Sequence, residues 1–258
     1  MPLLQKQGRQ IYWRTDGNPK LPKLVLLNSL GTEHGLWDPV MASLVESFHV
    51  LRMDKRGHGG STVLTDTCSM AELSDDVLSV MDAAGWARAS ICGVSIGGMQ
   101  AMWLGIHAPD RVERLVLSNT SAHIPAEVFA NRMAQVREQG LGLMAEQILG
   151  RFFTGGFIAA GSPTYHSVRE SLLQVDPVGY IACCSAIRDM DLLPEIDKIR
   201  APSLVIIGEH DQSTPPAMGE QIVAGIAGCE VAHMPYAHIP VSEAPQAYAE
   251  WVKGFLLG

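Results

Sequence analysis

The chain has 258 residues, of which 47% are hydrophobic and 18% charged, a balance that supports a buried core and argues against intrinsic disorder. The formal net charge of -8 leaves no basic surface, so we expect neither a nucleic-acid partner nor an anionic membrane. No stretch approaches the ~20 apolar residues of a membrane-spanning helix, and the N-terminus lacks the apolar run of a signal peptide. The five cysteines are odd in number, scattered and without metal-ligand spacing, and we interpret them as the reduced thiols of a cytoplasmic protein.

The strongest secondary-structure signal is a series of short apolar runs. Residues 10–14 come first, with Ile11 and Trp13 in alternation with polar residues, as in an antiparallel strand near the edge of a sheet. The later runs are rich in Val, Ile and Leu on both faces, which is typical of buried parallel strands. They span residues 23–28, 49–54, 89–94, 114–119, 203–208 and 229–234.

Between these runs the apolar residues take helical spacing. Residues 70–84 are one example, and residues 96–108, before Pro109, are another. A third helix over residues 242–257 closes the chain, with Ser242 as its expected N-cap. The alternation of strands and helices predicts an α/β protein with a mostly parallel, doubly wound sheet.

The alternation breaks between residues 121 and 199. The pattern there is helical, without a convincing strand. The expected helices span residues 126–139, 143–153, 163–175 and 178–190. We therefore divide the chain into a core domain of residues 1–120 and 200–258 and a helical cap subdomain of residues 121–199.

The motif Gly93-Val94-Ser95-Ile96-Gly97 carries the chemistry. It follows an apolar run and opens a helical one. A serine on a sharp turn from strand to helix crowds the residues two before and two after it, so both must be small. Gly93 and Gly97 meet this requirement, which makes Ser95 the predicted nucleophile.

A serine hydroxyl needs a base, and the base needs an acid that orients it. Sheets of this type supply the partners in the chain order Ser, Asp or Glu, His. Asp211 follows the run 203–208, and His238 follows the run 229–234, so we predict these two residues as acid and base. Taken singly, a loop aspartate or histidine is more often a surface residue than a catalytic one. Three neighbours are competing candidates, and we interpret them as loop or packed residues: Glu209, His210 and His233.

An acyl-transfer site also needs hydrogen-bond donors for the oxyanion. We predict the backbone N–H of Ile96, which directly follows the nucleophile, and that of Leu30 in Asn28-Ser29-Leu30-Gly31. The alternative for this second loop is a plain glycine turn.

The glycine-rich residues 54–61 contain Lys55 and Arg56 but lack the spacing of a phosphate-binding loop. We interpret Arg56 and His58 as braces of this loop. The sequence has no convincing metal-ligand spacing and no dinucleotide-binding motif, so we predict no metal and no cofactor.

With these motifs the chain resembles the α/β-hydrolase superfamily along its whole length, and most closely the 3-oxoadipate enol-lactonases. The likeness is carried by residues 28–32 with 36–38, 93–99, 119–122, 151–154, and His238 followed by Glu243. The resemblance implies an α/β-hydrolase fold with a helical cap inserted after the sixth strand. It also implies hydrolysis of a small carboxylated enol-lactone, in which Ser95 opens the ring and water releases 3-oxoadipate.

The resemblance also suggests where the substrate lies. Our candidate contacts are Trp37, Phe129, Arg132 and Arg188, with Arg132 first and Arg188 second as partner of a substrate carboxylate. For either arginine, a solvated face of a cap helix is the alternative. Phe129 stands where the family often has tryptophan, and Lys55 replaces a small polar residue.

Two other functions stay open at this point. The first is a broad esterase, lactonase or perhydrolase that acts on another small acyl compound. The second is a ligand receptor on a hydrolase scaffold. In each case the expected partner is a small molecule, and the oligomeric state, including a homo-oligomer, is left open.

Overall fold

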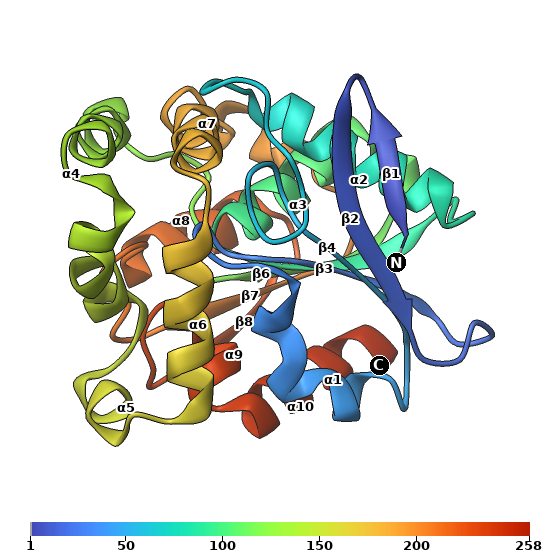
Figure 1. Ribbon diagram of the computed structural model, residues 1–258. Coiled ribbons are helices and arrows are strands. Elements are labelled where there is room, and N and C mark those ends of the chain that lie inside the picture. Colours follow the sequence, from blue (N-terminus) through green and yellow to red (C-terminus); the bar gives the residue numbers. More distant parts are fainter. Residues whose placement is uncertain (1) are drawn as a thin grey trace.

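The computed structural model describes residues 2–258, which fold around one sheet of eight strands (Figure 1). The strands are β1 (Leu3–Lys6), β2 (Arg9–Asp16), β3 (Lys23–Leu27), β4 (His49–Met53), β5 (Ala89–Val94), β6 (Val112–Ser118), β7 (Ser203–Gly208) and β8 (Glu230–Met234). Their order across the sheet is β1-β2-β4-β3-β5-β6-β7-β8. The pairs β1–β2 and β2–β4 are antiparallel, and all other pairs are parallel. The predicted α/β class and mostly parallel sheet are confirmed.

Each predicted apolar run contains a strand, because residues that are apolar on both faces fit the buried centre of a parallel sheet. Strand β1 was not predicted. It is short and alternates exposed and half-buried residues, so its apolar signal is weak. A turn with positive φ at Gln7 (49°) and Gly8 (79°) pairs it with β2.

Helices cover both faces of the sheet (Figure 1). They are α1 (Asp38–Leu44), α2 (Met70–Ala83), α3 (Ile96–His107), α8 (Pro216–Gly225), α9 (Pro240–Glu243) and α10 (Pro245–Leu257), with 3-10 turns η1 (His34–Trp37), η2 (Pro109–Arg111) and η3 (Leu193–Lys198). Helices α2, α3 and α8 lie on one face, and α1, α9 and α10 on the other. Within residues 2–258, no helix is both long and apolar enough to cross a membrane.

The predicted closing helix is divided in two. Helix α10 begins at Pro245, its N-cap is Ala244, and no side chain of residues 2–258 caps it. Ser242 lies in α9 with a buried Oγ that has no hydrogen-bond partner in the described part of the chain, so the predicted N-cap is wrong. The proline sets the start of α10, because proline fits the first turn, where its missing N–H costs nothing.

Four helices lie between β6 and β7 and gather on the left in Figure 1: α4 (Ala126–Phe152), α5 (Gly155–Ala160), α6 (Pro163–Gln174) and α7 (Pro177–Arg188). The helical insertion after the sixth strand is therefore confirmed. Helix α4 joins two predicted helices across a kink at Gly140, where φ is 75°. Helix α5 was not predicted, because it is only six residues long and opens on two glycines. The cap boundaries at 121 and 199 remain a prediction.

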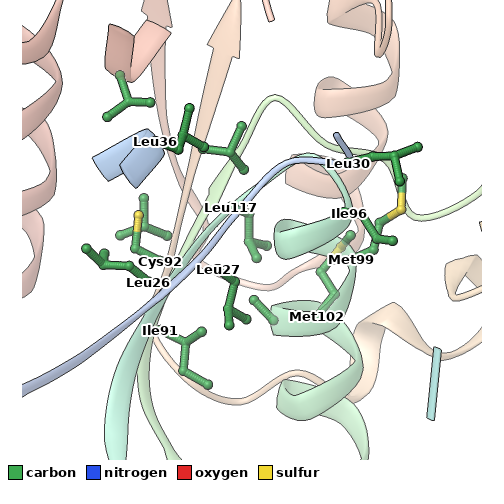
Figure 2. Close-up of a cluster of buried hydrophobic side chains, with 14 of the residues drawn as sticks. Leu26, Leu27, Leu30, Leu36, Ile91, Cys92, Ile96, Met99, Met102 and Leu117 are labelled. Carbon is green, nitrogen blue, oxygen red and sulfur yellow. The ribbon is translucent and has the colours of Figure 1, made fainter. Parts of the chain in front are cut away.

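The core packs tightly beneath the carboxyl ends of the central strands. Figure 2 shows one cluster of buried side chains from β3, β5 and α3. It includes Leu27, Ile91, Ile96 and Met102, each at most 2% exposed. This packing holds the turn between β5 and α3 on a rigid base.

Candidate active site

Ser95 occupies the sharp turn between β5 and α3. Its φ of 59° and ψ of −123° place it in a region that residues other than glycine rarely adopt. A Cβ on Gly93 would collide with the carbonyl of Gly97, and a Cβ on Gly97 with the carbonyl of Leu27. The two glycines are therefore required by the close approach of backbone that the motif predicts.

Neighbouring backbone and side chains fix this turn. The N–H of Ser95 donates to the carbonyl of Ser118 at 3.0 Å, and Thr120 Oγ1 donates to the carbonyl of Ser95 at 2.7 Å. Both partners belong to β6 or to the residues just after it. Ser95 is only 8% exposed, so its hydroxyl lies in a site nearly closed to water.

The side chains of Asp211 and His238 meet after β7 and β8. Nδ1 of His238 lies 2.8 Å from Oδ2 of Asp211, and both side chains are at most 2% exposed. Because a carboxylate only accepts, Nδ1 carries the proton, which leaves Nε2 as the acceptor that a general base needs. Burial opposes the negative charge of Asp211, but His238 and hydrogen bonds from Thr214 outweigh it and lower the pKa of Asp211.

Two further residues hold Asp211, and the sequence analysis did not assign them. Asn119 Nδ2 donates to Asp211 Oδ2 at 3.1 Å and to the carbonyl of Ala237 at 3.0 Å. Thr214 Oγ1 donates to the same carboxylate oxygen at 2.8 Å. The available signal for Asn119 was its position directly after β6, at the same edge of the sheet as Ser95.

The three predicted triad residues follow β5, β7 and β8, at one edge of the sheet. The structure joins His238 to Asp211 directly. Among the residues that the structure describes, no hydrogen bond joins Ser95 Oγ to His238. In enzymes without substrate this bond is often long and shortens only when substrate is bound.

The inserted helices contact His238, the predicted base. The ring of Phe152, the last residue of α4, lies 5.4 Å from the ring of His238 between centroids. Glu243 fixes this arrangement, because it accepts from Thr154 N at 3.1 Å and from Ala237 N at 2.9 Å. Phe152 therefore covers one side of the imidazole with an apolar ring.

The predicted oxyanion donors lie in the same buried cluster (Figure 2). Ile96 is the first residue of α3, so its N–H is one of the free donors at a helix N-terminus. Leu30 lies in the loop after β3, and its N–H makes no hydrogen bond to any part of the chain from residue 2 onward. Both N–H groups are therefore available to an incoming oxygen.

His58 braces its own loop, residues 54–61, in agreement with its predicted role, and it also holds the loop after β3. Its Nε2 accepts from Gly31 N at 3.0 Å, and its Nδ1 lies 2.8 Å from the carbonyl of Arg56. Burial and the charge of Lys55 lower the pKa of His58 to about 3, so the ring stays neutral. Arg56 donates to Asp76 at 2.7 Å and thereby holds residues 54–61 against α2.

The predicted substrate contacts have unequal surroundings. Trp37 is fully buried and donates to Asn28 Oδ1 at 2.8 Å, so we assign it to the support of the oxyanion loop. Arg188 forms two hydrogen bonds to Asp189, at 2.6 and 2.7 Å, which neutralise its charge. Phe129 is 8% exposed, with Cζ of Arg132 5.5 Å from the centre of its ring.

A second arginine of α4, Arg151, shares the surroundings of Arg132. Neither one forms an ion pair within residues 2–258, and both are half-buried. Burial lowers the pKa of Arg151, and the charge of Arg132 lowers it further. Burial also raises the pKa of Tyr180, which both arginines counteract. The ring of Tyr180 lies 3.6 Å from the position of a Cβ on Gly31, so Tyr180 packs against the oxyanion loop.

Glu33, His34 and Asp54 bring possible metal-ligand atoms within 4.8 Å of one another. Nδ1 of His34 lies 2.6 Å from Glu33 and 3.1 Å from Asp54. Burial opposes a charge on His34, but its hydrogen bonds to these two carboxylates raise its pKa to about 9. The contacts are those of a protonated imidazole between two carboxylates.

Comparisons with known proteins agree with this architecture. A family model described as the alpha/beta hydrolase fold matches residues 22–245. The 3-oxoadipate enol-lactonase 2 of Acinetobacter baylyi is 32% identical over 254 residues, which cover 98% of this chain and 95% of the relative. Enol-lactonase 1 of the same organism is 30% identical and covers 98% and 96%. The crystal structure of the enol-lactonase from Burkholderia xenovorans LB400 superposes with a TM-score of 0.97 at 35% identity and covers 100% of both chains.

Proposed function

This chain belongs to the α/β-hydrolase family, and on that premise we propose that it hydrolyses a small carboxylated enol-lactone, 3-oxoadipate enol-lactone, to 3-oxoadipate. The observation that carries the proposal is the buried His238–Asp211 pair at the sheet edge that also presents Ser95. The full-length likeness to enol-lactonases supports the choice of substrate.

In the proposed reaction, Ser95 Oγ attacks the lactone carbonyl carbon while His238 Nε2 takes the hydroxyl proton. The carbonyl oxygen becomes an oxyanion, which the N–H groups of Leu30 and Ile96 bind. Collapse breaks the bond between the carbonyl carbon and the ring oxygen, which leaves as an enol with the proton from His238. His238 then takes a proton from a water molecule, whose oxygen attacks the acyl carbon. Collapse of this second intermediate breaks the bond between that carbon and Ser95 Oγ, and His238 returns the proton to Ser95 Oγ. The acid product loses its own proton to solvent as a carboxylate, and the enol tautomerises to the ketone.

Arg132 and Arg151 are the proposed partners of the substrate carboxylate. Buried charges in proteins are normally paired, and two half-buried guanidinium groups that have no acidic partner among residues 2–258 favour an anionic ligand. Arg188 is a weaker candidate than the sequence suggested, because Asp189 already neutralises it.

Residues 121–199 are the proposed cap over this site. Phe152 against His238, and Tyr180 against Gly31, support a role of the cap in keeping water from the base and from the oxyanion loop. Phe129 lies beside Arg132 and is the proposed wall of the acyl pocket.

The test compares hydrolysis of 3-oxoadipate enol-lactone and of p-nitrophenyl acetate by wild type, Ser95→Ala and the control Ser47→Ala. Ser47 is a half-buried serine in the turn after α1. We expect wild type to turn over the lactone far faster than the ester, Ser95→Ala to abolish both reactions, and Ser47→Ala to behave as wild type.

Two results would contradict the proposal at different levels. Turnover of the ester alone would leave the Ser95 chemistry standing, replace the lactone with a broader ester class, and direct attention to Phe129. Activity of Ser95→Ala equal to wild type would exclude the serine mechanism altogether.

A further inference from the structure

Lys55 is a buried lysine that points at the oxyanion loop. It is 6% exposed, and its Nζ donates to the carbonyl of Ser29 at 2.7 Å and approaches that of Thr32 at 3.4 Å. Within residues 2–258 its ammonium group forms no ion pair and donates to no carboxylate. Both acceptors flank Leu30 and Gly31, so the ammonium group binds the backbone carbonyls of this loop.

The carbonyl of Ser29 belongs to the same peptide group as the N–H of Leu30. No peptide bond in the described chain is cis, so this C=O and N–H point in opposite directions. The carbonyl oxygen accepts from Lys55 Nζ, from Thr32 Oγ1 at 2.9 Å and from Thr32 N at 3.3 Å. These donors hold the carbonyl end of the peptide group inward, and the N–H end is thereby directed the opposite way.

The next peptide group is held as well, because Gly31 N donates to the neutral ring of His58. Leu30 is therefore fixed on both sides, while its own N–H has no protein acceptor from residue 2 to residue 258. A positive charge at the carbonyl end also polarises the peptide group and makes its N–H a stronger donor.

We propose that Lys55 is a positioning residue of the oxyanion hole, whose ammonium group orients and polarises the Ser29–Leu30 peptide group so that the Leu30 N–H stabilises the oxyanion. The inference rests on the proposed serine hydrolase function. It does not require that the lactone be the substrate, because every acyl transfer through Ser95 passes through an oxyanion.

The proposal has a consequence for pH. Burial lowers the pKa of Lys55 to about 8, against the opposing effects of Cys183, Asp54 and Glu33. The other titratable neighbours are His58, which stays neutral, and His34, whose pKa is raised to about 9 beside Asp54 and Glu33. As pH rises through 8, the ammonium group loses its charge, and the oxyanion hole weakens.

Deprotonation of Lys55, which weakens the oxyanion hole, makes the folded chain more stable. The pKa of Lys55 is lower in the folded chain than its ordinary value of 10.5, so the unfolded chain binds more protons between pH 8 and 10.5. The cost of burying the charge is therefore present below pH 8 and relieved as pH rises to 10.5. A merely structural lysine would not make activity fall while its own contribution to stability improves.

The experiment measures, from pH 6 to 10, the rate of Ser95 labelling by a fluorophosphonate probe, kcat and KM for the lactone and for p-nitrophenyl acetate, and the melting temperature. The variants are Lys55→Met, which keeps a long side chain but removes the hydrogen-bond donor, and the control Lys253→Met. The Nζ of Lys253 donates to Ser43 in α1 and not to the oxyanion loop. We expect Lys55→Met to lower labelling and kcat on the order of 10- to 100-fold at pH 7 with little change in KM. Lys253→Met should match wild type.

Across pH 8–10 we expect the activity ratio of wild type to Lys55→Met to fall, while wild type gains stability relative to the variant. His34→Gln, which removes the neighbouring imidazole whose pKa is about 9, should keep the alkaline decline near pH 8. This variant tests the proposal even if Lys55→Met does not fold.

Equal labelling by wild type and Lys55→Met, or an alkaline decline that disappears in His34→Gln, would overturn the role of Lys55. Normal labelling without lactone turnover would reject the lactone and leave the role of Lys55 intact. A wild type that neither labels nor hydrolyses would reject the serine hydrolase and this inference with it.

Discussion

The carboxyl edge of the sheet and the inserted helices differ in whether their charged side chains have partners. At the edge, the charged side chains of the site have partners: Asp211 is held by His238, Asn119 and Thr214, and Lys55 donates to Ser29. In the helices above it, Arg132 and Arg151 are half-buried and unpaired within the described chain. Charged groups that are paired before a ligand binds are held in place for the reaction, whereas an unpaired positive charge is available to an anionic ligand.

The difference separates chemistry from selectivity. The groups that would break an ester bond are positioned by strands and by the turns between strand and helix, which pack against the buried core. The groups that would recognise the acid part of a substrate lie on a helix that bends at Gly140. Substitutions at the edge should therefore affect all substrates, and those in α4 only some.

The largest effect is expected from Asp211→Asn. An amide in place of the carboxylate no longer fixes the proton on Nδ1 of His238, so the base loses its free Nε2. We expect kcat to fall on the order of 1,000- to 10,000-fold for the lactone and for a neutral ester alike, measured by steady-state kinetics.

The matched control is Glu209→Gln, which removes an exposed carboxylate directly after β7, the strand that also precedes Asp211. It should leave kcat unchanged. A loss of kcat confined to the lactone, or a comparable loss of kcat in Glu209→Gln, would contradict the proposal that substitutions at the sheet edge affect all substrates.

A smaller and selective effect is expected from Arg132→Ala and Arg151→Ala. Each removes a cation proposed to bind the substrate carboxylate, so KM for the lactone should rise about 10- to 100-fold, while KM for p-nitrophenyl acetate should change less than about twofold. Arg137→Ala is the control, because Arg137 lies on the same helix and pairs with Asp66 at the surface. Equal losses for the charged and the neutral substrate would remove these arginines from the recognition site.

The smallest effect is expected from His34→Gln, and it concerns stability. The pKa of His34 is raised to about 9, so its ion pairs stabilise the fold fully below the unfolded value of about 6.5, and this contribution is lost as pH rises through 9. Thermal or urea unfolding should show a deficit of about 1–3 kcal/mol at pH 6 that vanishes near pH 9.5.

His233→Gln is the comparison for this experiment, since His233 is half exposed and only near Glu220. It should show little deficit at either pH. A deficit in His34→Gln that persists unchanged at pH 9.5 would mean that packing, and not charge, makes the contribution.

Much of the candidate site could be predicted because it depends on local sterics and on strand order. Gly93 and Gly97 are needed wherever a serine stands on so sharp a turn, and the collisions at both positions bear this out. Asp211 and His238 were found because the ends of parallel strands share one edge of the sheet. Their catalytic role remains a prediction, although the two side chains do meet.

Other features were outside the reach of sequence patterns. Ser242 resembled an N-cap, but Pro245 starts the helix in its place. Asn119 and Thr214 converge on Asp211 from different strand ends, and no periodicity links them. Trp37 was expected at the substrate, whereas the fold buries it against Asn28.

By itself, the sequence determined the α/β class, the helical insertion and the position of the serine, since these follow from apolar periodicity and from steric limits on neighbouring residues. Only the tertiary structure decided which charges are paired. Lys55 and Ser29, or Arg132 and Arg151, become neighbours through strand register and helix packing, and these depend on contacts between distant segments. Whether a buried charge supports the loop or is available to a ligand is a property of those contacts.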